Sequence, residues 1–225
     1  MSLTNTTSSF GARFLTLAAL AGGLGFAVDS GAADAVRYTT KFGSKVSIAG
    51  TSSIHAWNMD GQIIQGFFEV PAGVVLDPAQ ANLAGVTDGK LNAKVETMIP
   101  VRSLKSTHSG MDEVMQQAMN AESHPKIQFS LTEMVLKGPH AAGTPLQFDT
   151  KGDLVVNGIT NKIAIPVSIE AADKGKLKVV GMVPLKMTDF KVKPPAPAVG
   201  LGLITTGDEV KISFEWLIAL AAPAK

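Results

Sequence analysis

Histidine is the residue type in this sequence best suited to acid–base or metal chemistry, and the chain has four of them. They are His55, His108, His124 and His140, and none of them forms an HxH or HExxH motif. The sequence contains no cysteine, which excludes a thiolate nucleophile, a cysteine-ligated metal and a disulfide bond. We therefore predict no metal site, and we place the last three histidines in loops or on the surface.

His55 is the histidine that we weigh as a catalytic residue, because it lies beside Trp57 in the segment GTSSIHAW at residues 50–57. A general base needs an acid partner or a nucleophile within hydrogen-bond reach, and the sequence shows neither near His55. A histidine beside a tryptophan at the end of a strand is more often structural. We predict that the protein is not an enzyme. An enzyme with His55 as general base stays open as an alternative hypothesis.

Motifs for nucleophilic catalysis and nucleotide binding are missing from the sequence, which has no GxSxG, GxGxxG or GxxxxGK[ST] segment. Lysine and arginine number 20 against 19 aspartate and glutamate, and the net charge of +1 gives no reason to bind nucleic acid. We therefore predict no cofactor and no nucleic-acid partner. Hydrophobic residues make up 45% of the chain, so apolar surface is what remains for binding.

The first 35 residues have the pattern of a cleavable export signal. An uncharged, mostly apolar run at 14–28 (FLTLAALAGGLGFAV) follows Arg13 and is shorter than the roughly 18 residues typical of a membrane span. Ala33-x-Ala35 fits the small-residue rule for cleavage, and Ser30-x-Ala32 is a second option. We predict a signal peptide at residues 1–35. The alternative is an ordinary buried N-terminal helix.

Alternating apolar and polar residues predict β-strands along most of the remaining chain. The clearest segments are 90–97 (KLNAKVET), 126–132 (KIQFSLT), 162–170 (KIAIPVSIE) and 209–216 (EVKISFEW). Weaker segments lie at 45–49, 66–70, 152–157 and 177–183. Short turn signals between them, above all Asn157-Gly158, favour an antiparallel sheet. About eight strands in one domain close most economically into a barrel, because closure removes exposed edges.

One helix interrupts the strands. Residues 111–119 (MDEVMQQAM) carry apolar side chains at helical spacing, and Pro125 ends any helix before the next strand. We expect Ser109 or Gly110 to cap this helix and expect the helix to cover one end of the barrel. The proline cluster at 193–197 begins a loop of about a dozen residues, since proline removes the donors that a strand needs.

The inward-facing positions of the predicted barrel are almost entirely apolar. They are Leu91, Val95, Ile99, Ile127, Phe129, Leu131, Ile163, Ile165, Val167, Val210, Ile212 and Phe214. An eight-stranded barrel is just wide enough to be filled by side chains or to hold one small ligand. Such a lumen favours a lipid-like chain over a sugar or nucleotide, whose polar groups would lack hydrogen-bond partners. The alternative is that these side chains pack against one another.

Six blocks of the chain carry a further signal. They are 46–57 (VSIAGTSSIHAW), 99–106 (IPVRSLKS), 124–129 (HPKIQF), 152–160 (GDLVVNGIT), 187–190 (MTDF) with 193–195 (KPP), and 208–214 (DEVKISF). In this order the blocks resemble the YceI-like family of polyisoprenoid-binding proteins. The first block resembles the opening strand of a subgroup with a GTSxxHxW motif. That subgroup often has an acid between the histidine and the tryptophan, and here Ala56 takes its place.

The resemblance implies an all-β fold over residues 36–225, an eight-stranded antiparallel lipocalin-like barrel with one short helix between strands. It implies non-catalytic binding, sequestration or transport of a long isoprenoid lipid such as a quinone or a polyprenyl phosphate. Family members are typically exported to the bacterial periplasm or beyond, which agrees with the predicted signal peptide. Transient membrane contact and a homodimer are further expectations. The alternative function is a stress-linked structural or partner-binding barrel with a filled core.

We expect the ligand-binding residues to lie on the inward faces of the strands and near the helix. The expected lining of the tail site is Val101, Leu104, Met115, Ile127, Phe129, Leu131, Ile165, Val167 and Phe214. His55, Trp57 and Arg102 are expected at the mouth, where they would meet a polar head group.

Overall fold

The computed structural model describes residues 35–81, 83, 86–196 and 204–222, so the predicted signal peptide lies outside the described residues except for Ala35. The strands are β1 (Val36–Thr40), β2 (Lys45–Ser52), β3 (Ala56–Gly61), β4 (Gln65–Val70), β5 (Lys94–Pro100), β6 (Lys126–Leu136), β7 (Leu146–Val156), β8 (Ile159–Ala172), β9 (Lys176–Lys186) and β10 (Thr206–Leu220). One α-helix, α1 (Ser109–Ala118), and three short 3-10 turns, η1 (Val101–Ser103), η2 (Asp173–Gly175) and η3 (Met187–Phe190), complete the described chain.

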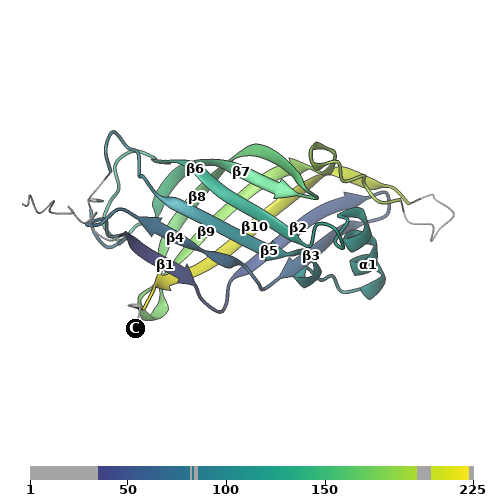
Figure 1. Cartoon of the computed structure of the whole chain (residues 1–225), viewed down its shortest axis with the longest axis horizontal. Coiled ribbons are helices and arrows are strands. Elements are labelled where there is room, and N and C mark those ends of the chain that lie inside the picture. Colours follow the sequence, from purple (N-terminus) through teal and green to yellow (C-terminus); the bar gives the residue numbers. More distant parts are fainter. Residues whose placement is uncertain (1–34, 82, 84–85, 197–203, 223–225) are drawn as a thin grey trace, which may run out of the picture. The chain divides into compact units, whose positions relative to one another are not determined.

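The strands form one antiparallel sheet that closes on itself (Figure 1). Its order is β1-β4-β5-β6-β7-β8-β9-β10-β2-β3, and β10 also pairs with β1. One edge of β10 pairs with β2 along Val210–Glu215 and with β1 along Ile218–Leu220. Strands β1 and β2 are therefore two halves of one bent strand, and β3 and β4 are two halves of the next. The result is the predicted closed eight-stranded antiparallel barrel.

The opening block of the sequence differs from the expectation of a single strand. Residues 46–57 comprise most of β2, a turn at 53–55 and the first residues of β3. The side-chain hydroxyl of Ser52 makes this turn, since its oxygen accepts hydrogen bonds from the backbone N–H groups of Ile54 and His55. The strand predicted at 90–97 also starts later, at Lys94.

The hairpin predicted at Asn157-Gly158 is confirmed between β7 and β8. Both residues have positive φ, 50° and 72°, which matches the twist of the two-residue turns that join antiparallel strands. This turn fixes the register of the longest described hairpin, from the Val156–Ile159 pair to the Leu146–Ile169 pair.

The helix lies where the sequence predicts it, between β5 and β6, but its N-terminus differs. The N-cap residue is His108, while Ser109 and Gly110 are inside the first turn. Figure 1 shows α1 at one end of the barrel, next to β2 and β3.

Alternation places apolar side chains inside the barrel and charged ones on its outer wall. Ion pairs join neighbouring strands across this wall at Arg37–Glu69, Lys151–Glu133, Lys162–Asp153 and Lys178–Glu170. The Lys151 ammonium lowers the pKa of the Glu133 carboxyl by donating a hydrogen bond to it.

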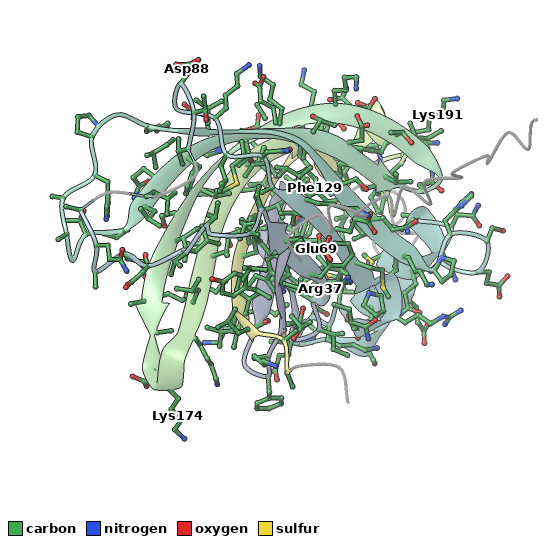
Figure 2. The ribbon with its side chains drawn as sticks, turned by 60° about the vertical axis from the view of Figure 1, so that its left-hand side comes forward. Arg37, Glu69, Asp88, Phe129, Lys174 and Lys191 are labelled. Carbon is green, nitrogen blue, oxygen red and sulfur yellow. The ribbon has the colours of Figure 1, made fainter. Side chains whose placement is uncertain are left out.

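Figure 2 shows Arg37 and Glu69 close together, and Asp88, Lys174 and Lys191 at the periphery. Exposed pairs of this kind contribute little stability and mainly keep the outer face hydrophilic.

Candidate functional site

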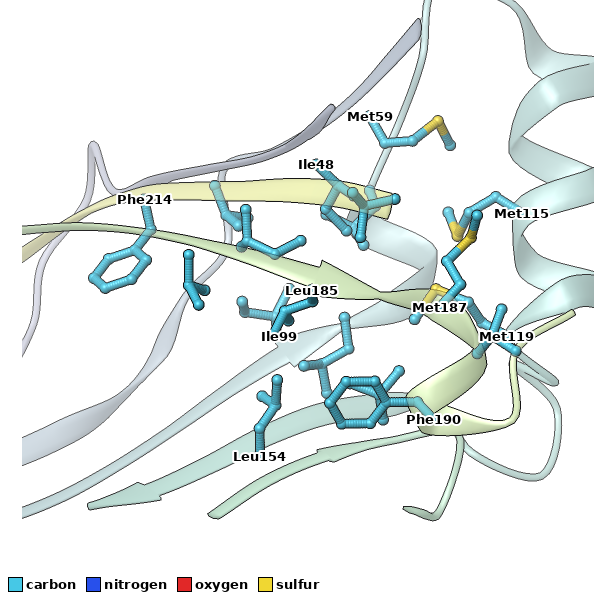
Figure 3. Close-up of a pocket in the computed structure, with 18 of the residues that line it drawn as sticks. Ile48, Met59, Ile99, Met115, Met119, Leu154, Leu185, Met187, Phe190 and Phe214 are labelled. Atoms are coloured by element: carbon cyan, nitrogen blue, oxygen red, sulfur yellow. The ribbon is translucent and has the colours of Figure 1, made fainter. Parts of the chain in front are cut away.

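A cavity of about 500 Å³ lies inside the barrel, and residues of every strand except β1 contribute to its wall. This volume falls within the roughly 300–1,000 Å³ typical of small-molecule binding sites. Figure 3 shows aliphatic, phenylalanine and methionine side chains directed into the space from the strands, α1 and η3. The lumen is therefore not filled by its own side chains, unlike the core of a packed barrel.

Ten of the twelve residues expected to bind ligand line this cavity. They are His55, Trp57, Leu104, Met115, Ile127, Phe129, Leu131, Ile165, Val167 and Phe214. The structure places the other two outside the cavity wall. Val101 is buried in a cluster with Met119 and Phe190, which line the cavity, but Val101 itself is not part of the wall. Arg102 is exposed and donates a hydrogen bond from Nη1 to the Gln116 side-chain oxygen, 3.2 Å away.

Three aromatic rings lie against glycines of the neighbouring strand. Phe214 is paired directly with Gly181 across β9 and β10, and Trp57 with Gly50 across β2 and β3. In both cases a Cβ on the glycine would overlap the ring, and the same holds for Phe129 over Gly152. Each ring is thus accommodated at the barrel wall in space that a side chain would otherwise occupy, which leaves the lumen open.

The polar groups in the deep part of the wall are satisfied by the protein itself. Thr150 donates to the carbonyl oxygen of Ile165 at 2.6 Å, and the Trp216 indole donates to the Thr40 hydroxyl at 2.8 Å. Among the described residues, no buried side-chain nitrogen or oxygen lacks a hydrogen-bond partner. The deep cavity therefore offers an apolar surface, and a polar ligand placed there would lose its hydrogen bonds to water without replacement.

Polar lining residues gather at the α1 end of the cavity. Ser52, His55, Lys186 and Thr206 line the cavity there, and Thr206 pairs directly with Ser52. His55 is exposed, and its Nδ1 lies 2.8 Å from the Ala56 carbonyl oxygen. Lys186 was not among the expected site residues, and its only signal in the sequence is its place at the end of an alternating strand, just before the MTDF block. This end of the site can meet a polar or anionic group.

Helix α1 covers this end with the side chains of Met111, Val114, Met115 and Ala118. A buried carboxylate, Asp112, attaches its first turn to the preceding loop. Asp112 accepts hydrogen bonds from the Ser106 backbone N–H at 2.7 Å and the Ser106 hydroxyl at 2.9 Å, and Lys105 lies 3.3 Å away. The backbone N–H of Ser106 is the main cause of the lowered pKa of Asp112, and the Ser106 hydroxyl and Lys105 add to it.

The turn η3 completes the end of the cavity with Met187 and Phe190, which sequence reasoning did not find. Polar contacts from two strands hold this turn. Asp208 of β10 accepts hydrogen bonds from the Thr188 hydroxyl at 2.7 Å and the Thr188 N–H at 2.9 Å, and these contacts lower the pKa of Asp208. Asn161 of β8 donates to the Asp189 carbonyl oxygen at 2.7 Å.

The described part of the chain holds no group of three or more histidine, aspartate or glutamate side chains placed to bind a metal ion. Among these same residues, no helix has the length and apolar character needed to cross a membrane.

Comparisons with known proteins agree with this geometry. The barrel is similar to Burkholderia cenocepacia BcnA, with a TM-score of 0.55, 19% identity, and coverage of 78% of this chain and 96% of that one. It is also similar to a polyisoprenoid binding domain from Saccharophagus degradans implicated in plant cell wall breakdown, with a TM-score of 0.59, 10% identity, and coverage of 82% and 98%. At these identities the likeness concerns the fold.

No curated protein sequence matches the chain significantly. The sequence profile of the YceI-like domain matches residues 41–217, which is well over half of the chain. The chain therefore belongs to the YceI-like domain family.

Proposed function

We propose that the protein binds and carries a long-chain isoprenoid lipid in the barrel cavity without transforming it. The observation that carries this proposal is the apolar cavity of about 500 Å³, whose deep polar groups are already satisfied. The S. degradans neighbour, described as a polyisoprenoid binding domain, supports the class of ligand.

The energetics of chain burial are sufficient for this function. Each methylene removed from water contributes about 0.8 kcal/mol, so one five-carbon prenyl unit contributes roughly 4 kcal/mol. Association itself costs about 4–15 kcal/mol, and micromolar affinity requires a net of about 8 kcal/mol. Roughly three to six buried prenyl units therefore account for micromolar binding without a strong polar contact.

The head group of the lipid would lie at the α1 end, beside Lys186 and His55. We propose a quinone or polyprenyl phosphate type of lipid, since an ammonium and an imidazole can meet a carbonyl or a phosphate oxygen. The segment 50–57 also supports assignment to the GTSxxHxW subgroup, with Ala56 at the position often taken by an acid.

We also propose that residues 1–35 direct export to the bacterial periplasm or beyond, where the carrier contacts membranes transiently. N-terminal sequencing of the protein recovered from that compartment tests the cleavage site, and light scattering of the same material tests for a homodimer. A mature chain that retains residues 1–35 would contradict the export proposal.

Native mass spectrometry of the protein purified from its own periplasm, followed by organic extraction, tests the carrier function. We expect a bound species of isoprenoid mass. An empty protein that also fails to take up added polyprenyl chains would contradict the proposal and favour a structural or partner-binding role.

A matched pair of variants tests whether the cavity is the binding site. Leu154 lines the cavity, while its neighbour Val155 on the same strand is not part of the wall. We expect Leu154→Trp to fill part of the lumen and reduce the amount of bound lipid, and Val155→Trp to leave it near wild type. Equal lipid content in both folded variants would contradict binding in the lumen.

A further inference from the structure

The ladder between β8 and β9 stops halfway along the barrel. Its pairs run from Ala172–Lys176 to Val167–Gly181. Beyond that point β8 continues to pair with β7 as far as Val156–Ile159, and β9 continues to pair with β10 as far as Lys186–Glu209. Within the described chain, no ladder pair joins residues 159–166 of β8 to residues 182–186 of β9.

Two prolines explain where the ladder stops. Continuing the register past Val167–Gly181 would place Pro166 opposite Met182 and Pro184 opposite Ala164. A residue in an antiparallel strand directs its N–H to one neighbouring strand only, so a proline removes a donor from one ladder and leaves the other intact. The ladders β7–β8 and β9–β10 continue past Pro166 and Pro184. The side of each proline that lacks an N–H donor therefore faces the opposite strand across the unpaired stretch, so Pro166 faces β9 and Pro184 faces β8.

The unpaired stretch of the barrel wall is bounded at both ends by contacts between its two sides. The Val167–Gly181 pair closes one end, and the hydrogen bond from Asn161 to the Asp189 carbonyl oxygen closes the other. Residues 162–166 lie between these closures, which corresponds to roughly 17 Å of strand. We call this stretch, residues 162–166 of β8 and 182–186 of β9, the β8–β9 slot.

The centre of the slot is apolar on both faces. On the inside, Ile163 and Ile165 of β8 and Val183 and Leu185 of β9 line the cavity. On the outside, the exposed residues at its centre carry no charge: Ala164, Pro166, Met182 and Pro184. The rest of the outer wall carries ion pairs, and the nearest of these, Lys162–Asp153, lies at the edge of the slot. Apolar side chains therefore lie on both the cavity side and the outer side of this part of the wall.

We infer that the β8–β9 slot is the lateral portal through which an isoprenoid chain passes between the cavity and a lipid phase; this inference rests on the proposed carrier function. Separating β8 from β9 here breaks no ladder hydrogen bond, while opening any fully paired strand would break several. Entry at the α1 end is harder, because a chain entering there must pass His55 and move lengthwise beneath a helix held by Asp112. A lateral slot admits the chain sideways.

The absence of cysteine from the chain allows a direct test by single labels. Ala164→Cys places a thiol at the slot, and Ile54→Cys places one at the rim of the α1 end. Ser130→Cys places one on the exposed outer face of β6, at a position paired with both neighbouring strands. Each thiol is modified with a large polyethylene-glycol maleimide. The measurement is the rate at which each protein takes up tritiated geranylgeraniol from phosphatidylcholine vesicles.

We expect the label at position 164 to slow uptake by about tenfold, and the labels at 54 and 130 to leave the rate near that of the unlabelled protein. The amount bound after long incubation should be the same in all of them. Uptake slowed only by the label at 54, or slowed by none, would overturn the portal. An unlabelled protein that takes up no probe would refute the carrier function itself, and the portal with it.

A second variant keeps the test independent of labelling. Pro166→Val with Pro184→Val restores both backbone donors, so β8 and β9 are expected to pair along the slot. We expect new protection of amides from hydrogen exchange in residues 162–166 and 182–186, together with slower uptake of geranylgeraniol. New protection without any change in the uptake rate would overturn the portal.

Discussion

The ring of Phe214 occupies the space that a side chain at position 181 would need, and Phe214 and Gly181 are direct partners across β9 and β10. The glycine thus lets the ring rest at the wall of the barrel. Because Phe129 with Gly152 and Trp57 with Gly50 repeat the arrangement on two other strand pairs, three of the largest side chains in the lumen leave its centre open. The volume of this cavity therefore depends on the residues that the aromatic rings pack against as well as on the size of the rings.

Gly181→Ala tests this relationship. The added methyl overlaps the Phe214 ring, and the adjacent cavity gives the ring room to move inward. We expect weaker binding of geranylgeraniol, by about tenfold, and a loss of about 1 kcal/mol in the free energy of unfolding in urea. The double variant Gly181→Ala with Phe214→Leu removes the overlap and should recover binding. Failure of the second change to recover any binding would contradict the proposed role of the ring.

The barrel itself was predictable from sequence because period-two alternation identifies which side chains share a face, and short turns restrict the topology. Eleven of the twelve positions predicted to face inward line the cavity, and the twelfth, Leu91, is buried outside it. The cavity was not predictable. Its volume depends on pairs such as Phe214 with Gly181, which lie 33 residues apart and meet only through strand register.

The attachment of α1 through Asp112 is expected to be lost in acid. Asp112 has a lowered pKa in the folded protein, so the stabilisation that it provides is present above the ordinary aspartate pKa of about 3.9 and is lost as pH falls through the lowered value. We expect α1 amides to lose protection from hydrogen exchange in that acidic window. Asp112→Asn should cause the same loss at neutral pH, whereas Glu113→Gln, on the exposed neighbour, should not. Full protection of α1 in Asp112→Asn would contradict the anchor.

Lys186 provides a test of the head group. An ammonium at the cavity mouth favours an anionic head, but the side chain is exposed, so its contribution is below about 1 kcal/mol, or less than roughly fivefold in affinity. We expect Lys186→Gln to weaken binding of geranylgeranyl phosphate and to leave geranylgeraniol unaffected, as measured by competition. Lys211→Gln, on an outer face, serves as the control. Equal losses for the two lipids would contradict contact with the head group.

The two expected site residues that lie off the cavity show where extrapolation from a strand fails. Alternation through Ile99 places Val101 inward, but β5 ends at Pro100 and η1 begins at Val101. The 3-10 turn carries Val101 into the cluster with Phe190 and leaves Arg102 in solvent beside α1. The alternating pattern of a strand predicts the direction of a side chain only as far as the backbone stays extended.

Asn161 closes one end of the slot, so replacing it should change the rate of lipid transfer more than the affinity for the lipid. Asn161→Ala deletes the hydrogen bond to the Asp189 carbonyl oxygen, at a cost of about 1 kcal/mol, while Asn157 continues to donate to the carbonyl oxygen of Phe190. We expect bound geranylgeraniol to transfer to acceptor vesicles about three- to tenfold faster.

Thr160→Ala, at the exposed neighbouring position, is the control, and its bound lipid should transfer at the wild-type rate. Because the cavity wall is unchanged in both variants, the equilibrium amount bound should stay the same. Weaker binding at an unchanged transfer rate would mean that Asn161 supports the wall of the cavity and not the closure of the slot.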